Sequence, residues 1–183
     1  REAGSFHGNI LMKPALTLYS LEKPLDLEIR CPVDTQALPL IRSLVTTVAS
    51  QMGFNEEEVE HIEMAVDEAC ANVIRHAYKH LGVSSDLAEE KRAKNGGAEG
   101  GCSIWLRLHL NPRHLKICVI DRGVGIDGQP AGYQSVEEFK EKGGDGGLGV
   151  YIIRRFMDEV AYDCPPESGT VLTMVKYLKD RPE

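Results

Sequence analysis

The sequence has no apolar run that approaches the roughly 20 residues needed to cross a bilayer as a helix, so a membrane-spanning protein is not expected. Residues 1–10 also lack the charged-then-apolar order of a signal peptide. Excess positive charge is missing too, because the formal net charge is −7. This charge argues against direct nucleic-acid binding, but it leaves room for a local basic pocket for nucleotide phosphates.

Paired cysteines are missing as well. The five cysteines are odd in number, widely scattered, and form no Cys-x-x-Cys pair: Cys31, Cys70, Cys102, Cys118 and Cys164. This spacing fits neither a zinc site nor a disulfide framework. We therefore expect reduced, mostly buried thiols and a cytoplasmic location.

The length and composition suit one folded domain. The chain has 183 residues, of which 42% are hydrophobic and 27% charged. A domain of this size can bury a sizeable core without disulfide or metal support. We expect the domain to span residues 25–178, preceded by an N-terminal extension, residues 1–24, that is a linker or part of an edge strand. The first residue is Arg1 and not methionine, so the sequence leaves open whether the domain belongs to a longer chain.

The first half of the domain predicts a strand and two helices. Residues 25–31 alternate apolar and polar side chains, which is typical of a half-buried strand. A helix over residues 38–52, capped by Asp34 or Thr35, should end at Gly53. Asn55 and Glu58 have the spacing of a capping box and should open a long helix that runs to about Tyr78. One apolar stripe follows that helix: Ile62, Ala65, Val66, Ala69, Val73 and Ala77.

The second half predicts mostly strands. Residues 81–101 are polar and glycine-rich and should form a flexible insertion. Residues 102–110 and 115–120 read as a hairpin. A helix over 148–157 and two short strands, 160–162 and 170–177, complete the pattern. Hairpins outnumber β-α-β crossovers, which favours a mixed, largely antiparallel sheet with helices on one face, in an α/β (α+β) two-layer sandwich.

The first candidate site lies on the long helix. Glu68 and Asn72 are four residues apart and therefore neighbours on the helix surface, and Arg75 and Lys79 extend the same polar strip. A carboxylate there can act as a general base. An amide oxygen one turn further on can coordinate Mg²⁺, which prefers oxygen ligands and substrate phosphates. Taken alone, this spacing is more often a solvated helix face.

The second candidate site is Asp121-Arg122-Gly123-Val124-Gly125, directly after a strand. The Asp121 carboxylate can accept a hydrogen bond from the exocyclic amine of adenine, and the glycines let the backbone approach a flat ring. The plainer interpretation is a turn in which aspartate is a local cap.

The third segment is Gly143-Gly144-Asp145-Gly146-Gly147-Leu148-Gly149, which opens a helix. Glycine-rich backbone at a helix N-terminus offers free N–H groups and a favourable dipole to phosphates. Its Gly-x-Gly-x-x-Gly spacing imitates the dinucleotide fingerprint, but the polar residues 137–142 precede it instead of a strand, so a Rossmann unit is rejected. No Gly-Lys-Ser/Thr follows, which excludes a Walker P-loop.

The order of these three segments strengthens the functional interpretation of each one. Ser168-Gly169-Thr170 and a last strand follow them in the chain. It resembles the N, G1 and G2 boxes of the GHKL ATPases (the Bergerat-type ATP-binding fold). The similarity is strongest to the bacterial anti-sigma-factor serine/threonine-protein kinases. Residues 65–78 resemble that family's N-box helix almost throughout, and residues 147–160 resemble its G2 segment.

The resemblance implies a role for each matching residue. Glu68 would be the general base, and Asn72 would hold Mg²⁺ with ATP. Asp121 would accept a hydrogen bond from the adenine amine, and Thr170 would support this contact through a water molecule.

The resemblance assigns the glycines to the nucleotide pocket. Gly123 and Gly125 would line the adenine and hinge an ATP lid over residues 126–146. Gly147 and Gly149 would meet the phosphates.

The family phosphorylates a serine of a small anti-sigma-factor antagonist and often forms homodimers. The resemblance therefore implies a serine kinase that also sequesters a partner such as a sigma factor. The insertion 81–101 is long for the family, and the lid has few basic residues, Lys140 and Lys142. Two alternatives stay open: a non-catalytic module in which ATP gates protein binding, and the catalytic domain of a histidine kinase, for which the residues before Leu25 are too few to supply a dimerisation domain.

Overall fold

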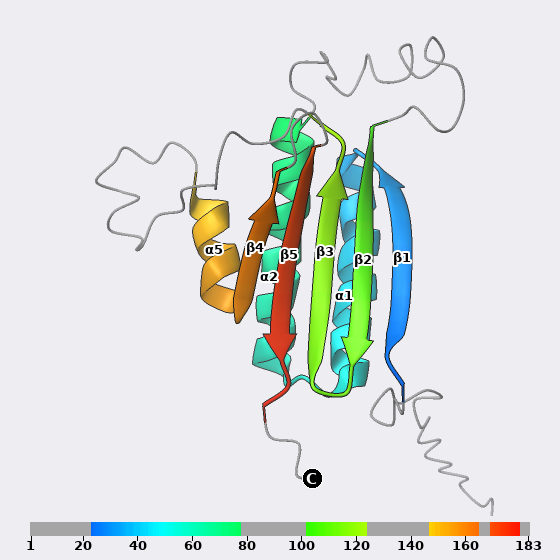
Figure 1. Ribbon diagram of the computed structural model, residues 1–183, viewed down its shortest axis with the longest axis vertical. Helices are drawn as coiled ribbons and strands as arrows, with labels where there is room; N and C mark the ends of the chain where they lie inside the picture. Colours follow the sequence, from blue (N-terminus) through cyan, green and yellow to red (C-terminus); the bar gives the residue numbers. More distant parts are fainter. Residues whose placement is uncertain (1–22, 78–101, 124–146, 165–168, 180–183) are drawn as a thin grey trace, which may run out of the picture.

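The computed structural model describes residues 23–77, 102–123, 147–164 and 169–179. They form two layers, with three α-helices packed on one face of a five-stranded sheet (Figure 1). The strand order is β1-β2-β3-β5-β4, and each pair of neighbours is antiparallel. The strands are β1 (Leu25–Pro32), β2 (Ser103–Asn111), β3 (His114–Asp121), β4 (Glu159–Asp163) and β5 (Thr170–Tyr177).

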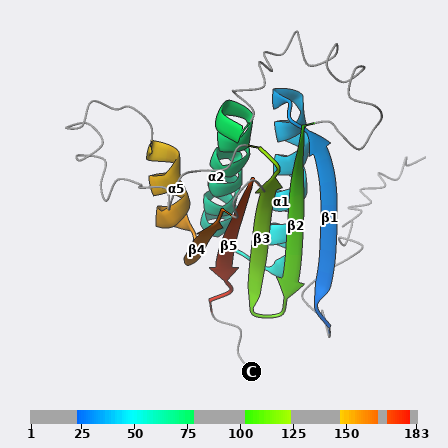
Figure 2. The same cartoon turned by 45° about the horizontal axis from the view of Figure 1, so that its top comes forward.

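The helical layer contains α1 (Leu38–Met52), α2 (Glu56–Asn72) and α5 (Leu148–Phe156). A 3-10 turn, η2 (Thr35–Ala37), leads into α1, and a π-helical segment, η3 (Val73–Ala77), extends α2. Turning the molecule shows α1 and α2 side by side behind the sheet, with α5 next to α2 (Figure 2). Among the described residues, no helix has the length and apolarity to cross a membrane.

The core lies between the sheet and the helices because each strand alternates its side chains between two faces. Residues of β2 that face the helices are nearly inaccessible, and so is the predicted apolar stripe of α2. Leu106, Leu108, Ile117 and Met174 are each at most 1% exposed. The opposite face of the sheet carries polar and charged side chains, including a paired Glu28 and Arg107.

Local sequence explains where the helices begin and end. Asn55 accepts a hydrogen bond from the Glu58 N–H at 2.8 Å, and the Glu58 carboxylate accepts one from the Asn55 N–H at 3.1 Å, which completes the predicted capping box. Gly53 ends α1 in the left-handed conformation, with φ 97°. Asp34 caps the 3-10 turn and not α1 itself, whose first turn contains Pro39.

The predicted sheet, hairpin and helices are confirmed, with two corrections. The long helix changes to π-helical geometry after Asn72. The sequence did not indicate this change, because apolar residues four apart fit both helix types. All five cysteines are free thiols, but only Cys70 is buried, and burial raises its pKa to about 12. The extension up to residue 22, the insertion 81–101, the lid 126–146 and Gly125 lie outside the described residues.

Candidate functional site

The polar strip on α2 forms one connected cluster. Glu68, half-buried with 31% of its side chain exposed, accepts a hydrogen bond at Oε2 from Nη2 of Arg75 at 3.1 Å. The same nitrogen lies 3.4 Å from Oδ1 of Asn72. Nε of Arg75 donates to the Ala71 carbonyl at 3.2 Å, which fixes the guanidinium along the helix. The carboxylate and the amide predicted from the sequence therefore share one cation.

The N-terminal end of α5 lies against this cluster. A Cβ atom added to Gly149 would stand 2.5 Å from Oε2 of Glu68 and 3.4 Å from Nδ2 of Asn72. A side chain there would displace the end of Glu68, so glycine permits the approach. Gly147 precedes the helix with φ 83°. Two segments far apart in the chain, the helix with Glu68 and the glycine-rich helix start, thus meet in the structure.

A second cluster forms where β3 ends. Asp121 is buried, 3% exposed, and its Oδ1 accepts a hydrogen bond from the Gly123 N–H at 2.7 Å. Thr170 lies directly opposite Asp121 across the β3–β5 pair and is also buried. Burial raises the pKa of the Asp121 carboxyl, and hydrogen bonds from Gly123 and from Thr170 offset part of that increase. Such a carboxyl is an acceptor held in a fixed direction.

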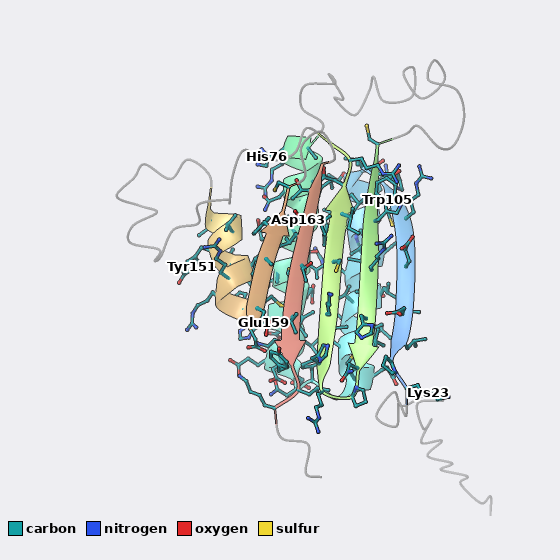
Figure 3. The ribbon with its side chains drawn as sticks, in the orientation of Figure 1. Lys23, His76, Trp105, Tyr151, Glu159 and Asp163 are labelled. Carbon is teal, nitrogen blue, oxygen red and sulfur yellow. The ribbon has the colours of Figure 1, made fainter. Side chains whose placement is uncertain are left out.

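Gly123 connects the two clusters. A Cβ atom added to it would collide with the backbone carbonyl of Ala77, the last residue of η3. The loop after Asp121 therefore rests directly on the helix that carries Asn72, about one helical turn beyond it. Figure 3 shows His76 at this end of η3, and Trp105 toward the same end of the sheet.

Arg75 is the one member of the site whose role the sequence did not reveal. Its place in the polar strip was visible, but the spacing does not say that it binds both Glu68 and Asn72. The i to i+3 spacing from Asn72 and the seven-residue spacing from Glu68 were the available signals, since both separations return to one helix face.

The described residues suit an oxygen-bound cation held jointly with a phosphate group. They contain no group of three or more His, Cys, Asp or Glu side chains that could hold a metal alone. Within the part of the chain that the structure describes, Oδ1 of Asn72 has a long contact with Arg75 at 3.4 Å, which a cation can replace. Mg²⁺ is commonly bound by one or two protein oxygens together with substrate phosphates and water.

A family model for the histidine kinase-like ATPase domain matches residues 31–176, most of the chain and both clusters. The chain belongs to the histidine kinase-like ATPase family. It is therefore an ATP-binding domain, and the family resemblance drawn from the sequence is confirmed.

Curated relatives carry the name serine-protein kinase RsbW. The chain is 30% identical to the one from Bacillus subtilis over 156 residues, which are 83% of this chain and 85% of the relative. It is 31% identical to the one from Bacillus pumilus, with the same coverage. The relative from Halalkalibacterium halodurans is 29% identical over 167 residues, 87% of each chain. These alignments span nearly the whole of each relative.

Proposed function

We propose that the chain is an ATP-dependent serine protein kinase that phosphorylates a small antagonist protein and acts as an anti-sigma factor. Its similarity to relatives named serine-protein kinase supports the reaction class. The observation that carries the proposal is the approach of Gly149 to Glu68 and Asn72. It brings the Glu68 carboxylate, the Asn72 amide and the N-terminus of α5 together, and in the proposal these serve as base, metal ligand and phosphate-binding site.

The proposed reaction is one displacement at phosphorus. The serine hydroxyl oxygen of the antagonist forms a bond to the γ-phosphorus of ATP, and the bond from that phosphorus to the β,γ-bridging oxygen breaks, releasing ADP. Glu68 accepts the hydroxyl proton as the new bond forms. Positioning and electrostatic stabilisation supply most of the acceleration in such transfers, so the fixed geometry around Glu68 matters more than covalent chemistry by the protein.

The remaining residues would hold the nucleotide. Asp121 would accept a hydrogen bond from the adenine amine, with Thr170 beside Asp121. Gly123 and Gly125 would line the adenine ring. Gly147 and Gly149 would offer backbone N–H groups to the phosphates. When bound, Mg²⁺ would neutralise phosphate charge, with Asn72 as its protein ligand.

The partner and setting extend the proposal beyond the site. The substrate would be a small serine-bearing antagonist, a sigma factor would be the sequestered partner, and the kinase would work in the cytoplasm as a homodimer. Residues 126–146 would form the ATP lid. The support for these points is the family resemblance and not a described contact.

One observation favours a second candidate, an ATP-gated binding module without catalysis. Oε2 of Glu68 is already engaged by Arg75, so the oxygen that would receive a substrate proton has a partner. The pair is open to solvent, however, with 54% of the Arg75 side chain exposed. Exposed ion pairs are weak, about 0–1 kcal/mol, so substrate binding can displace this one.

The test uses the full chain, Mg-ATP labelled at the γ-phosphate, and small candidate antagonists, each beside a serine-to-alanine variant. The kinase proposal predicts transfer to the wild-type antagonist and none to its alanine variant. If no candidate is phosphorylated, yet partners bind differently with ATP and with ADP, the binding module replaces the kinase. If ATP itself does not bind, both proposals fail.

A further inference from the structure

The helices α2 and α5 run antiparallel and touch at two levels. At one level, Gly149 near the start of α5 meets Glu68. At the other, the ring of His61 on α2 stacks on Phe156 at the end of α5, with centroids 4.2 Å apart and an interplanar angle of 11°. These two contacts are about two helical turns apart along each helix. The stack and the site therefore lie on the same contact line.

The C-terminal end of α5 is also fixed to the sheet. Nζ of Lys176, a buried residue of β5, donates to the carbonyl of Phe156 at 2.7 Å and lies 3.3 Å from Oδ1 of Asp158. Asp158 in turn accepts from the Tyr177 N–H at 2.8 Å. The last carbonyls of a helix have no partner within the helix, and a cation there is also favoured by the helix dipole.

Two independent contacts thus meet at Phe156. Its ring is held by His61 from α2, and its carbonyl is held by Lys176 from β5. A helix of nine residues is short and stiff, so fixing one end sets the position of the other. The other end carries Gly149, which approaches so closely that an added side chain would displace the end of Glu68.

We infer that His61, Phe156 and Lys176 are positioning residues that set how close the N-terminus of α5 comes to Glu68 and Asn72. The inference rests on the proposed function, because it gives the distant end of α5 a role in holding the phosphates of ATP. These residues touch neither nucleotide nor substrate in this account; they act through the placement of Gly147 and Gly149. Misplacement of a site by about 1 Å can reduce a rate by roughly 100-fold.

Paired substitutions separate positioning from general packing. His61→Ala removes the stack, whereas His61→Phe keeps an aromatic ring against Phe156. Lys176→Met keeps the chain length but loses the donor, whereas Lys176→Arg keeps a donor. His109→Ala is the matched control, since this histidine also makes a side-chain contact, with Asp26 at 2.6 Å, but between β1 and β2 at the other side of the sheet.

Calorimetry with Mg-ATP is the first readout, on the full chain after circular dichroism has established folding. We expect His61→Ala and Lys176→Met each to weaken ATP binding by about 3- to 10-fold. The effect should be smaller than the roughly 100-fold of a 1 Å misplacement, because each substitution removes one of the two contacts that hold α5. His61→Phe and Lys176→Arg should recover most of the affinity, and His109→Ala should bind ATP as the wild type does. Gly149→Ala should also be combined with His61→Ala or with Lys176→Met. The loss of ATP-binding free energy in each double variant should be smaller than the sum of the two single losses, because both substitutions disturb the approach of α5 to Glu68.

The outcomes distinguish this inference from the proposed function. If the wild type does not bind ATP, the proposed function fails and the inference fails with it. If the wild type binds ATP and transfers phosphate, but His61→Ala and Lys176→Met bind ATP no more weakly than His109→Ala, the inference alone is overturned. Where one of the two variants does not fold, the other variant and its conservative partner decide the same question. Additive losses in the double variants with Gly149→Ala also contradict the inference.

Discussion

Nη2 of Arg75 lies 3.1 Å from Oε2 of Glu68, and both side chains project from the same helix face. The pair holds the carboxylate on the side of α2 that Gly149 approaches. Arg75 therefore fixes the orientation of the proposed general base before any substrate arrives, although its exposure makes the interaction weak.

Arg75→Met should reduce phosphotransfer by about 3- to 10-fold, part of the contribution of an oriented general base. The free energy of unfolding should change by less than about 1 kcal/mol, as is usual for exposed ion pairs. The control is the Glu68→Gln background, in which the same substitution should have almost no further effect on transfer. An equal loss in both backgrounds would show that Arg75 acts elsewhere.

Asp121→Asn should weaken ATP binding by roughly 10- to 100-fold, because one acceptor oxygen facing the adenine amine becomes a donor and about 1–3 kcal/mol of a buried hydrogen bond is lost. Calorimetry with ATP measures this loss. GTP, which presents a carbonyl where adenine has its amine, is the control and should not lose affinity in the variant. Unchanged ATP affinity in Asp121→Asn would refute the assignment.

The raised pKa of Asp121 also predicts how the free energy of unfolding changes with pH. Burial raises its folded pKa above the ordinary value of 3.8, so the neutral carboxyl is favoured in the folded state. That stabilisation is fully present below pH 3.8 and is lost as the pH rises through the raised folded pKa. Urea unfolding should therefore show the wild type gaining stability relative to Asp121→Asn as the pH falls. A difference that grows with rising pH would contradict the burial effect.

Gly123 and Gly149 should respond differently to alanine. The added Cβ at Gly123 meets backbone of Ala77, which cannot rotate away, so stability should fall by about 1–3 kcal/mol. The added Cβ at Gly149 meets the end of the Glu68 side chain, which can turn into solvent. Gly149→Ala should therefore unfold close to the wild-type temperature but transfer phosphate poorly. The two variants are controls for each other, and the reverse pattern in thermal unfolding would be inconsistent with these contacts.

Trp105, the only tryptophan, should report on nucleotide binding. The guanidinium of Arg122 lies 4.8 Å from its ring centroid, and Arg122 directly follows Asp121. Nucleotide at Asp121 should shift Arg122 and alter the tryptophan emission, since a cation over the ring perturbs its electrons. Arg122→Ala should bind ATP but lose most of the emission change. An identical change in that variant, at saturation verified by calorimetry, would exclude this route.

Much of the fold follows from the sequence because its patterns are local. The Asn55–Glu58 capping box and the apolar stripe from Ile62 to Ala77 each depend on residues a few positions apart. Alternation in residues 102–110 and 115–120 fixed the central hairpin in the same way. The switch to π-helix after Asn72 escaped prediction, since four-residue spacing suits both geometries.

The site was predictable in its members but not in its contacts. The Glu68, Asn72 and Asp121 segments stand out by residue type and order, whereas the approach of Gly149 to Glu68 depends on how α2 and α5 pack. Such packing joins residues about 80 positions apart, and no local pattern encodes it. The same holds for the His61–Phe156 stack, because no sequence pattern links these two residues.

Asn72→Ala should separate metal binding from catalysis. Losing the amide oxygen should weaken Mg-ATP binding, whereas binding of ATP without Mg²⁺ should change little, because the metal bridges protein and phosphates. Calorimetry with and without Mg²⁺ gives both values, and Asn72→Asp, which keeps an oxygen ligand, is the control. Equal losses in both conditions would assign Asn72 to a direct phosphate contact instead.

The central claim is that Glu68 is the general base of a serine kinase, and single-turnover transfer by Glu68→Gln tests it most directly. This variant keeps size and polarity but cannot accept the serine proton. Phosphotransfer from Mg-ATP to a serine-bearing antagonist should fall by about 10²- to 10⁴-fold, the usual share of general-base catalysis. ATP affinity, measured on the same preparation, should stay within about 3-fold of wild type, since the base acts only in the transfer step. Transfer at the wild-type rate, with ATP bound equally well, would contradict the account.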